Sequence, residues 1–306
     1  MPMPFERLPA GWHGACCLCG EMKFLVSGVV VLLKKFAALG FALFTICASG
    51  SAFAQGTPDP ATPPATEKET WKAPFGGNFT AGFAFLNDYS YRGISQTQLQ
   101  VAAQVNVGYE TPTVSEAIAL SAYVGAWGSN VYFPNTGAIA EIDLLTGLRY
   151  KTMQDKLTFD LGYIRYNYLG AASNLFYDFN EFGLVGGYDF GVAQLSAAVR
   201  YSPNFYANSG IAWYKWAQVT VPLPFIKVNE NVAFKVFGNV GNQYVERFAN
   251  YGIPTNNYWD WQLGAVVSVY GFDISAAYTD TNVDIQGCLN TLNCQGRIIV
   301  GIAKAF

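Results

Sequence analysis

From about residue 75 to the end of the chain, apolar and polar residues alternate with a period of two. In the stretch 101–109, for example, Val105 and Val107 fall on one parity, and Gln104 and Asn106 fall on the other. Successive side chains of a β-strand point to opposite faces, so this pattern predicts strands with one apolar and one polar face. We count twelve such segments, near residues 78–88, 101–109, 117–127, 140–150, 157–163, 179–188, 194–201, 212–221, 232–241, 259–269, 272–279 and 298–306.

The links between these segments alternate between short and long. Short links such as 189–191 and 270–271 alternate with long polar or aromatic ones such as 169–178 and 281–296. Bacterial outer-membrane barrels have this asymmetry, with short periplasmic turns and long external loops, and about ten residues suffice for a tilted membrane strand. We therefore predict an all-β fold for residues 75–306, a transmembrane up-and-down antiparallel β-barrel of twelve strands with both chain ends in the periplasm.

A soluble β-barrel or sandwich in the periplasm would show the same alternation with its apolar face turned inward, so periodicity alone does not separate the two folds. Two features favour the membrane. The polar parity carries charged residues together with many small ones, which suits a wet lumen. Aromatic residues also fall near the expected strand ends, where the girdles of a membrane barrel lie: Tyr109, Trp127, Tyr150, Tyr163, Tyr188, Tyr201, Trp259 and Tyr278.

Residues 1–54 have the features of an N-terminal extension followed by a secretory signal peptide. Two lysines precede an apolar stretch, and a small-x-small motif ends at Ala54, so we expect cleavage after that residue. Met22 is an alternative start to Met1. The following segment, 55–74, is rich in Pro, Thr and Ala, which predicts a flexible periplasmic tail.

The composition excludes several other classes of protein. Only 13% of the residues are charged, 51% are hydrophobic, the net charge is −3 and the pI is about 5.2. Disordered chains and basic nucleic-acid-binding proteins have far more charge, so we expect no nucleic-acid partner. The single histidine, His13, precedes the expected cleavage site. The processed chain would therefore lack the Ser-His-Asp arrangement and His-zinc sites, and we expect no catalytic residues, metal or cofactor.

Seven charged residues on the polar parity of the predicted strands are candidate pore-lining groups: Glu141, Asp143, Arg149, Asp160, Arg200, Asp260 and Asp273. In an open lumen these side chains would set the electric field, and the excess of acids predicts a weak preference for cations. The alternative is a closed network of internal ion pairs that fills the barrel.

The first and last long connections contain further candidates. Asp88, Tyr91 and Arg92 lie in the first, where Arg92 is suited to donate to a phosphate or carboxylate of a solute or of lipopolysaccharide. The alternative is that Arg92 pairs with Asp88 or caps turn carbonyls. In the last long connection, Cys288 and Cys294 are close together in an exported chain, which predicts a disulfide staple, with redox sensing as the alternative.

The end of the chain resembles the signal by which outer-membrane barrels are recognised by their assembly machinery. The last residue is Phe306, and Ile298, Val300 and Ile302 alternate before it, although Lys304 stands where an aromatic residue is commoner.

A longer resemblance rests on the stretch FLNDYSYRGISQT at 85–97, on GAWGS at 125–129 and on the late cysteine pair. With these features, residues 75–306 resemble the Gcw_chp family of proteobacterial proteins, also called TorF-type porins. The resemblance implies an outer-membrane location, a pore role and no established catalytic residues.

From these observations we expect a bacterial outer-membrane channel for passive diffusion of small hydrophilic solutes, without enzymatic activity. The alternative is a structural or interaction barrel with a plugged lumen, whose aromatic-rich loops at 132–133, 176–177 and 205–206 bind lipopolysaccharide or a partner. The expected partners are outer-membrane lipid, lipopolysaccharide, the barrel-assembly machinery and small solutes, and an oligomer is compatible with the sequence.

Overall fold

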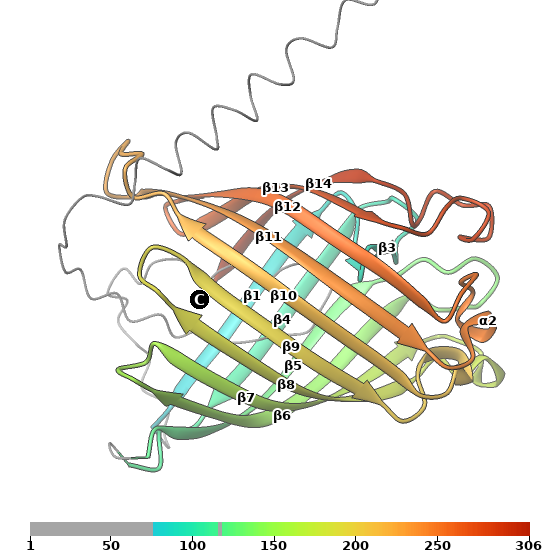
Figure 1. The fold of residues 1–306 in the computed structure, drawn as a ribbon, viewed down its shortest axis with the longest axis horizontal. Coiled ribbons are helices and arrows are strands. Elements are labelled where there is room, and N and C mark those ends of the chain that lie inside the picture. Colours follow the sequence, from blue (N-terminus) through green and yellow to red (C-terminus); the bar gives the residue numbers. More distant parts are fainter. Residues whose placement is uncertain (1–75, 116–117) are drawn as a thin grey trace, which may run out of the picture. The chain divides into compact units, whose positions relative to one another are not determined.

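In the computed structural model, the described residues, 76–115 and 118–306, form a closed antiparallel β-barrel (Figure 1). The prediction of an all-β barrel of twelve strands is confirmed. The barrel strands are β1 (Asn78–Leu86), β4 (Ala102–Glu110), β5 (Leu120–Asn130), β6 (Ala140–Thr152), β7 (Leu157–Leu169), β8 (Phe179–Asp189), β9 (Gln194–Ser202), β10 (Ala212–Pro222), β11 (Val232–Val245), β12 (Asn257–Val269), β13 (Phe272–Thr281) and β14 (Arg297–Ala305). The expected signal peptide, the cleavage after Ala54 and the Pro-rich tail lie outside the described residues.

Further short elements lie in the connections. A two-stranded hairpin, β2 (Ser90–Tyr91) and β3 (Ile94–Ser95), lies between β1 and β4. Short helical turns follow β7, β9 and β11, namely η2 (Ser173–Leu175), η3 (Tyr206–Asn208) and α2 (Phe248–Tyr251). Within 76–115 and 118–306, no helix is long and apolar enough to cross a membrane.

The two ends of the barrel differ in their connections. We call one the short-turn end, where the connections are 111–119, 153–156, 190–193, 223–231 and 270–271. We call the other the long-loop end, where they are 87–101, 131–139, 170–178, 203–211, 246–256 and 282–296. In Figure 1, α2 and the last connection lie at the right, and the C-terminus lies toward the left, at the short-turn end. The alternation is as predicted, except that 111–119 and 223–231 are as long as several connections of the opposite end.

The two faces of the barrel wall follow the predicted parity. On β7, the outward Leu161 is 58% exposed, whereas its neighbour Asp160 is buried. On β12, Leu263 is 68% exposed and Gln262 is buried. Because the strands close into a ring, the inner face carries the polar and charged side chains and the outer face the apolar ones.

Trp127 departs from the expected girdle. It shares the inward parity of β5, and its ring packs edge-on against the ring of Tyr89, with 5.3 Å between centroids. The prediction that Trp127 lies at a membrane interface is therefore wrong. The alternation in this strand is weak because small residues occupy both faces, and the weak pattern left the side of the tryptophan undetermined.

The barrel closes where its first and last strands pair. Five residues of β1, from Gly82 to Leu86, pair with β14, and Phe306 exchanges backbone hydrogen bonds with Ala81 of 3.3 and 2.8 Å. Lys304 is outward here, and its ammonium lies 4.2 Å from the ring centroid of Phe272 and 5.4 Å from that of Phe306. A cation over aromatic faces is a stable arrangement at such a position, so the lysine keeps aromatic contacts where an aromatic residue is commoner.

Candidate functional site

The inner face of the barrel carries all seven of the charged residues selected from the sequence. Glu141, Asp143 and Arg149 lie on β6, Asp160 on β7, Arg200 on β9, Asp260 on β12 and Asp273 on β13. All seven side chains are buried. They therefore lie inside the barrel, but other parts of the chain cover them.

Toward the short-turn end, the charges form a closed polar cluster on one wall. Arg149 binds Glu110 at 2.7 Å and Asp160 at 3.1 Å. The hydroxyl of Tyr123 donates to Asp160 Oδ1 at 2.8 Å, and the Arg149 guanidinium lies 5.0 Å from the Tyr123 ring centroid. A Cβ at Gly147 would come within 2.5 Å of the Tyr123 hydroxyl oxygen, so this glycine leaves the space that the ring occupies.

A small cavity of about 10 Å³ lies beside this cluster. Its lining residues come from neighbouring strands: Tyr123, Leu145, Asp160, Gly162, Ile164, Gly183, Val185 and Arg200. This volume is close to the smallest that holds one water molecule. The cavity is thus a gap in a packed interior and too small for an organic solute.

At the long-loop end, the connection 87–101 folds into the barrel and carries the β2–β3 hairpin with it. Asp88, Tyr91 and Arg92, the candidate ligand contacts of the sequence, are all buried there. Asp88 accepts hydrogen bonds from Ser95 Oγ at 2.6 Å and from Arg297 Nε at 2.5 Å. We call residues 87–101 the inward hairpin.

Arg92 forms the tip of the inward hairpin and contacts the opposite wall. Its Nη2 donates to both carboxylate oxygens of Glu181 on β8, at 2.7 and 2.6 Å, and its Nη1 donates to Gln243 Oε1 on β11. The guanidinium carbon lies 4.2 Å from the ring centroid of Tyr214. Arg92 therefore pairs with Glu181, whereas Asp88, its suggested partner, pairs with Arg297.

The electrostatics of this pair favour the charged state of the arginine. Burial opposes charge on the guanidinium, but the adjacent Glu181 carboxylate raises the pKa of Arg92 well above its usual value. The Arg92 side chain therefore stays cationic, and it remains a charge-assisted donor to Glu181.

A second contact joins the inward hairpin to β6. The Tyr89 hydroxyl donates to Glu141 Oε1 at 3.0 Å. The other oxygen of Glu141 and both oxygens of Asp143 are buried without a hydrogen-bond partner among the described residues. The buried carboxylates of Glu141 and Asp143 thus have fewer hydrogen-bond and charge partners than the carboxylates that pair with arginines. Even so, the described part of the chain contains no group of three or more His, Cys, Asp or Glu residues suited to a metal ion.

Aromatic side chains from four connections and from the end of β7 pack together at the long-loop end of the barrel. The rings of Tyr177 and Tyr206 stack with 4.3 Å between centroids, and Phe133 meets Tyr168 at 5.7 Å and Tyr206 at 6.2 Å. Tyr251 on α2 meets Tyr206 at 6.1 Å. This aromatic cap packs against the same buried cluster as Tyr89 and Tyr91 of the inward hairpin.

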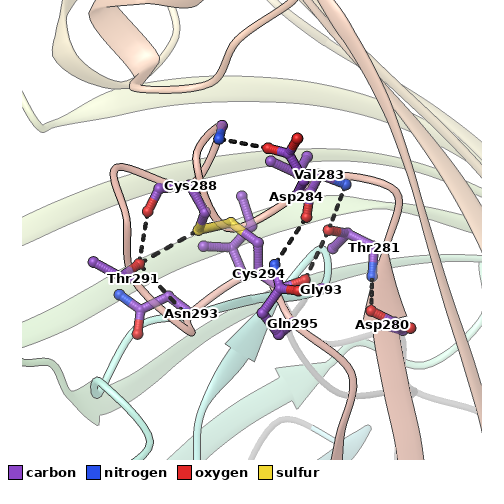
Figure 2. Close-up of a disulfide and its surroundings, with 12 residues drawn as sticks. Gly93, Asp280, Thr281, Val283, Asp284, Cys288, Thr291, Asn293, Cys294 and Gln295 are labelled. Atoms are coloured by element: carbon purple, nitrogen blue, oxygen red, sulfur yellow. Dashed lines mark hydrogen bonds between the residues drawn. A yellow bond between two sulfur atoms is a disulfide. The ribbon is translucent and has the colours of Figure 1, made fainter. Parts of the chain in front are cut away.

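The disulfide between Cys288 and Cys294 lies in the last long connection, with 6.0 Å between the two Cα atoms (Figure 2). The connection contacts the inward hairpin directly, because Ser95 N donates to the carbonyl of Asn293 at 2.8 Å. Arg297 Nη1 donates to the carbonyl of Gly93 at 3.0 Å and to that of Asn293 at 3.1 Å. The disulfide-bonded loop therefore holds the hairpin in place.

The inward position of the hairpin was not predicted from the sequence. Its strands have two residues each, too few for a period-two signal, and the partners of Arg92 lie 89 and 151 positions away. The signal that was available is Gly93 alone, since glycine is favoured at the second position of a two-residue hairpin turn.

Comparison with known proteins finds one matching family model and several solved structures of low sequence identity. The family model described as "Bacterial protein of unknown function (Gcw_chp)" matches residues 70–306. No curated protein matches. Among solved structures, the NanC porin is 10% identical with a TM-score of 0.43, and the match covers 74% of this chain and 98% of that one.

Two further solved structures are similarly distant. The COG4313 outer membrane channel from Pseudomonas putida F1 is 6% identical with a TM-score of 0.42, covering 79% of this chain and all of that one. LpxR from Salmonella typhimurium is 10% identical with a TM-score of 0.39, covering 74% of this chain and 99% of that one. At such scores these likenesses carry no argument about what this chain does.

Proposed function

The chain belongs to the Gcw_chp family of bacterial proteins, whose description gives no function, and we propose a function from the geometry of the chain itself. The proposed function is that of a bacterial outer-membrane channel for passive diffusion of small hydrophilic solutes. The observation that carries the proposal is a closed barrel with an apolar outer face and a charged inner face. A β-barrel with this inside-out distribution is suited to lipid outside and water inside.

The outer face supports the membrane location. Leu144, Leu161, Leu184 and Leu263 are each about half exposed or more, on four different strands. Soluble monomers rarely expose contiguous apolar surface of this extent, whereas lipid chains solvate it at no cost. We therefore place the barrel wall in the hydrocarbon layer, with the short-turn end in the periplasm.

The inner face supports a channel that needs neither cofactor nor energy. Solutes would move along an inner wall of charged, polar and small side chains, and the inward hairpin would set the constriction. Because Arg92 and Asp88 tie this hairpin to the wall, conduction would require the hairpin to move.

A weak cation preference follows from the unpaired charges. Among the described residues, the inward acids Glu141, Asp143 and Asp260 take part in no ion pair. Arg200 is the only inward arginine of the described residues that takes part in none. Since Lys151 shares the inward parity of β6, three carboxylates against two cationic side chains leave a small excess of acids, which favours cations in a narrow pore.

The test is electrical. The full chain is expressed in a Gram-negative host, purified from the outer-membrane fraction and inserted into planar bilayers. We expect discrete conductance steps that become larger or more frequent in Glu181→Gln, since that change removes the partner of Arg92. We also expect Asp143→Asn to shift the reversal potential in a salt gradient toward anions, with Asp178→Asn, an exposed loop carboxylate, as the control.

An inserted protein that remains silent in all variants would favour the second candidate, a plugged interaction barrel. The observation behind it is the buried inward hairpin, with the aromatic cap packed against the same cluster, at the long-loop end of the barrel. Of the aromatic pairs proposed for binding, Tyr132 and Phe176 are exposed, whereas Phe205 is buried. In that case Tyr132 and Phe176 are the residues through which the barrel would contact lipopolysaccharide or a partner.

A further inference from the structure

The backbone at the tip of the inward hairpin is unfavourable for arginine. Tyr91 pairs with Ile94, so Arg92 and Gly93 are the two turn residues, and their φ angles are +50° and +82°. A two-residue turn with two positive φ angles favours Asn-Gly or Gly-Gly, and a long side chain at its first position is disfavoured. Such an outlier at a buried site points to a role for the side chain itself.

The wall opposite the hairpin forms a socket around that side chain. Its members are Tyr166 on β7, Glu181 on β8, Phe205 beyond β9, Tyr214 on β10 and Gln243 on β11. We call these five residues the lumenal socket. They belong to the wall and its connections, and none belongs to the inward hairpin.

The two polar acceptors of the lumenal socket, Glu181 and Gln243, are oriented by contacts that do not involve Arg92. The Tyr166 hydroxyl donates to Glu181 Oε2 at 3.1 Å, which holds the carboxylate in position. The amide nitrogen of Gln243 donates to the Tyr244 carbonyl at 2.9 Å, which turns its oxygen toward the guanidinium. The socket is therefore preorganised, as binding sites for specific ligands are.

The chemistry of the socket matches a planar guanidinium. A carboxylate and an amide oxygen accept from its edge, and aromatic rings cover its faces, with the guanidinium carbon 4.2 Å from the Tyr214 centroid and 5.6 Å from that of Phe205. A guanidinium stacks on rings and donates in a fixed plane, whereas an ammonium is a compact and strongly hydrated charge.

We propose that the lumenal socket is a binding site for guanidinium compounds, which the chain's own Arg92 occupies when the hairpin is inserted. A guanidinium-bearing solute would take the place of Arg92 when the hairpin withdraws. This inference rests on the proposed channel, since the solute must reach the lumen, and it names the class of solute that the channel would select.

The same contacts argue against the opposite assignment, an anion bound by Arg92. Both oxygens of Glu181 already neutralise the guanidinium, and the aromatic rings leave no polar face for a phosphate. An incoming anion would have to displace a buried carboxylate that is fixed to the wall, whereas an incoming cation displaces a residue on a connection.

The test uses a variant that empties the socket and keeps the turn. Arg92→Gly places Gly-Gly at the two positive φ positions, and Arg92→Asn, which gives the favoured Asn-Gly turn, is the second variant if the first does not fold. The full chain is purified from the outer membrane in detergent, and its melting temperature is measured with millimolar methylguanidinium chloride at constant ionic strength. Methylammonium is the matched cation.

We expect methylguanidinium to raise the melting temperature of Arg92→Gly by several degrees, because a ligand that binds only the folded state stabilises it. Wild type, whose socket is occupied, and the double variant with Glu181→Gln should not respond, and methylammonium should have less than a third of the effect. An equal response to the two cations, or an unchanged response in the double variant, would overturn the proposal.

The melting experiment does not depend on conduction, so the two proposals can fail separately. Stabilisation by methylguanidinium in a barrel that carries no current would support the socket and refute the channel. Currents without any stabilisation would support the channel and refute the socket.

Discussion

Arg297 Nε donates to Asp88 Oδ2 over 2.5 Å, so the last strand of the barrel holds the connection that follows the first strand. Both side chains are largely buried, and Asp88 also accepts from Ser95 and Thr97, at 2.6 and 2.8 Å. This ion pair fixes the base of the inward hairpin, and the ion pair of Arg92 with Glu181 fixes its tip.

Replacing Asp88 with Asn should destabilise the barrel strongly. The change leaves the Arg297 charge without its carboxylate in a buried position, and breaking such a pair costs about 3 kcal/mol. Asp178→Asn is the matched control, because the pair of Asp178 with Arg165 is exposed and worth at most about 1 kcal/mol. Urea unfolding in lipid vesicles measures both, and equal losses for the two variants would contradict the anchoring role.

The membrane location predicts a penalty for charge on the outer wall. Leu161→Arg near the middle of β7 should cost about 2–4 kcal/mol in lipid, because the guanidinium would face hydrocarbon. Val192→Arg, in the short turn 190–193, is the control and should be close to neutral. Since a soluble barrel would accept an arginine at an exposed position, an unchanged unfolding free energy for Leu161→Arg in vesicles would refute the location.

Packing inside the barrel wall predicts a third effect. A Cβ at Gly264 would come within 2.6 Å of both Ala277 Cβ and Phe237 Cζ and 2.9 Å of a backbone oxygen, so Gly264→Ala should destabilise the barrel by about 1–3 kcal/mol. At Gly186 the nearest atoms are 3.8 Å away, and Gly186→Ala should be tolerated. The temperature at which the folded band disappears in a gel-shift assay distinguishes the two.

Removing the disulfide should loosen the inward hairpin. Replacing Cys288 and Cys294 with Ala frees a short loop, for which chain entropy predicts a loss of about 2 kcal/mol. Because Ser95 N donates to the Asn293 carbonyl, hydrogen exchange at the Ser95 amide should accelerate.

Tyr244, whose amide belongs to the β10–β11 pairing on another part of the wall, should keep its protection in the same double variant. Unchanged exchange at Ser95 would show that the loop does not hold the hairpin.

The local pattern of apolar and polar residues was sufficient to predict the barrel wall. It was insufficient to predict the side-chain contacts inside the barrel. On β12, alternation alone assigned Trp259 and Leu263 to one face and Asp260 to the other, because strand parity is a property of neighbouring residues. Arg92 and Glu181 are 89 positions apart, and their contact depends on the ring closing at the right circumference. No local period carries that information, so sequence reasoning weighed the nearer partner Asp88 for Arg92.

The pairing of Arg297 with Asp88 has a consequence for the order of folding. The two residues are 209 positions apart, and each lies next to the pairing of β1 with β14 that closes the barrel. Closing so long a loop is slow relative to hairpin formation between consecutive strands, so the ring should zip along the chain and join its ends last. The base of the inward hairpin is therefore fixed only when the final strand arrives, so that closing the wall and anchoring the hairpin become a single event.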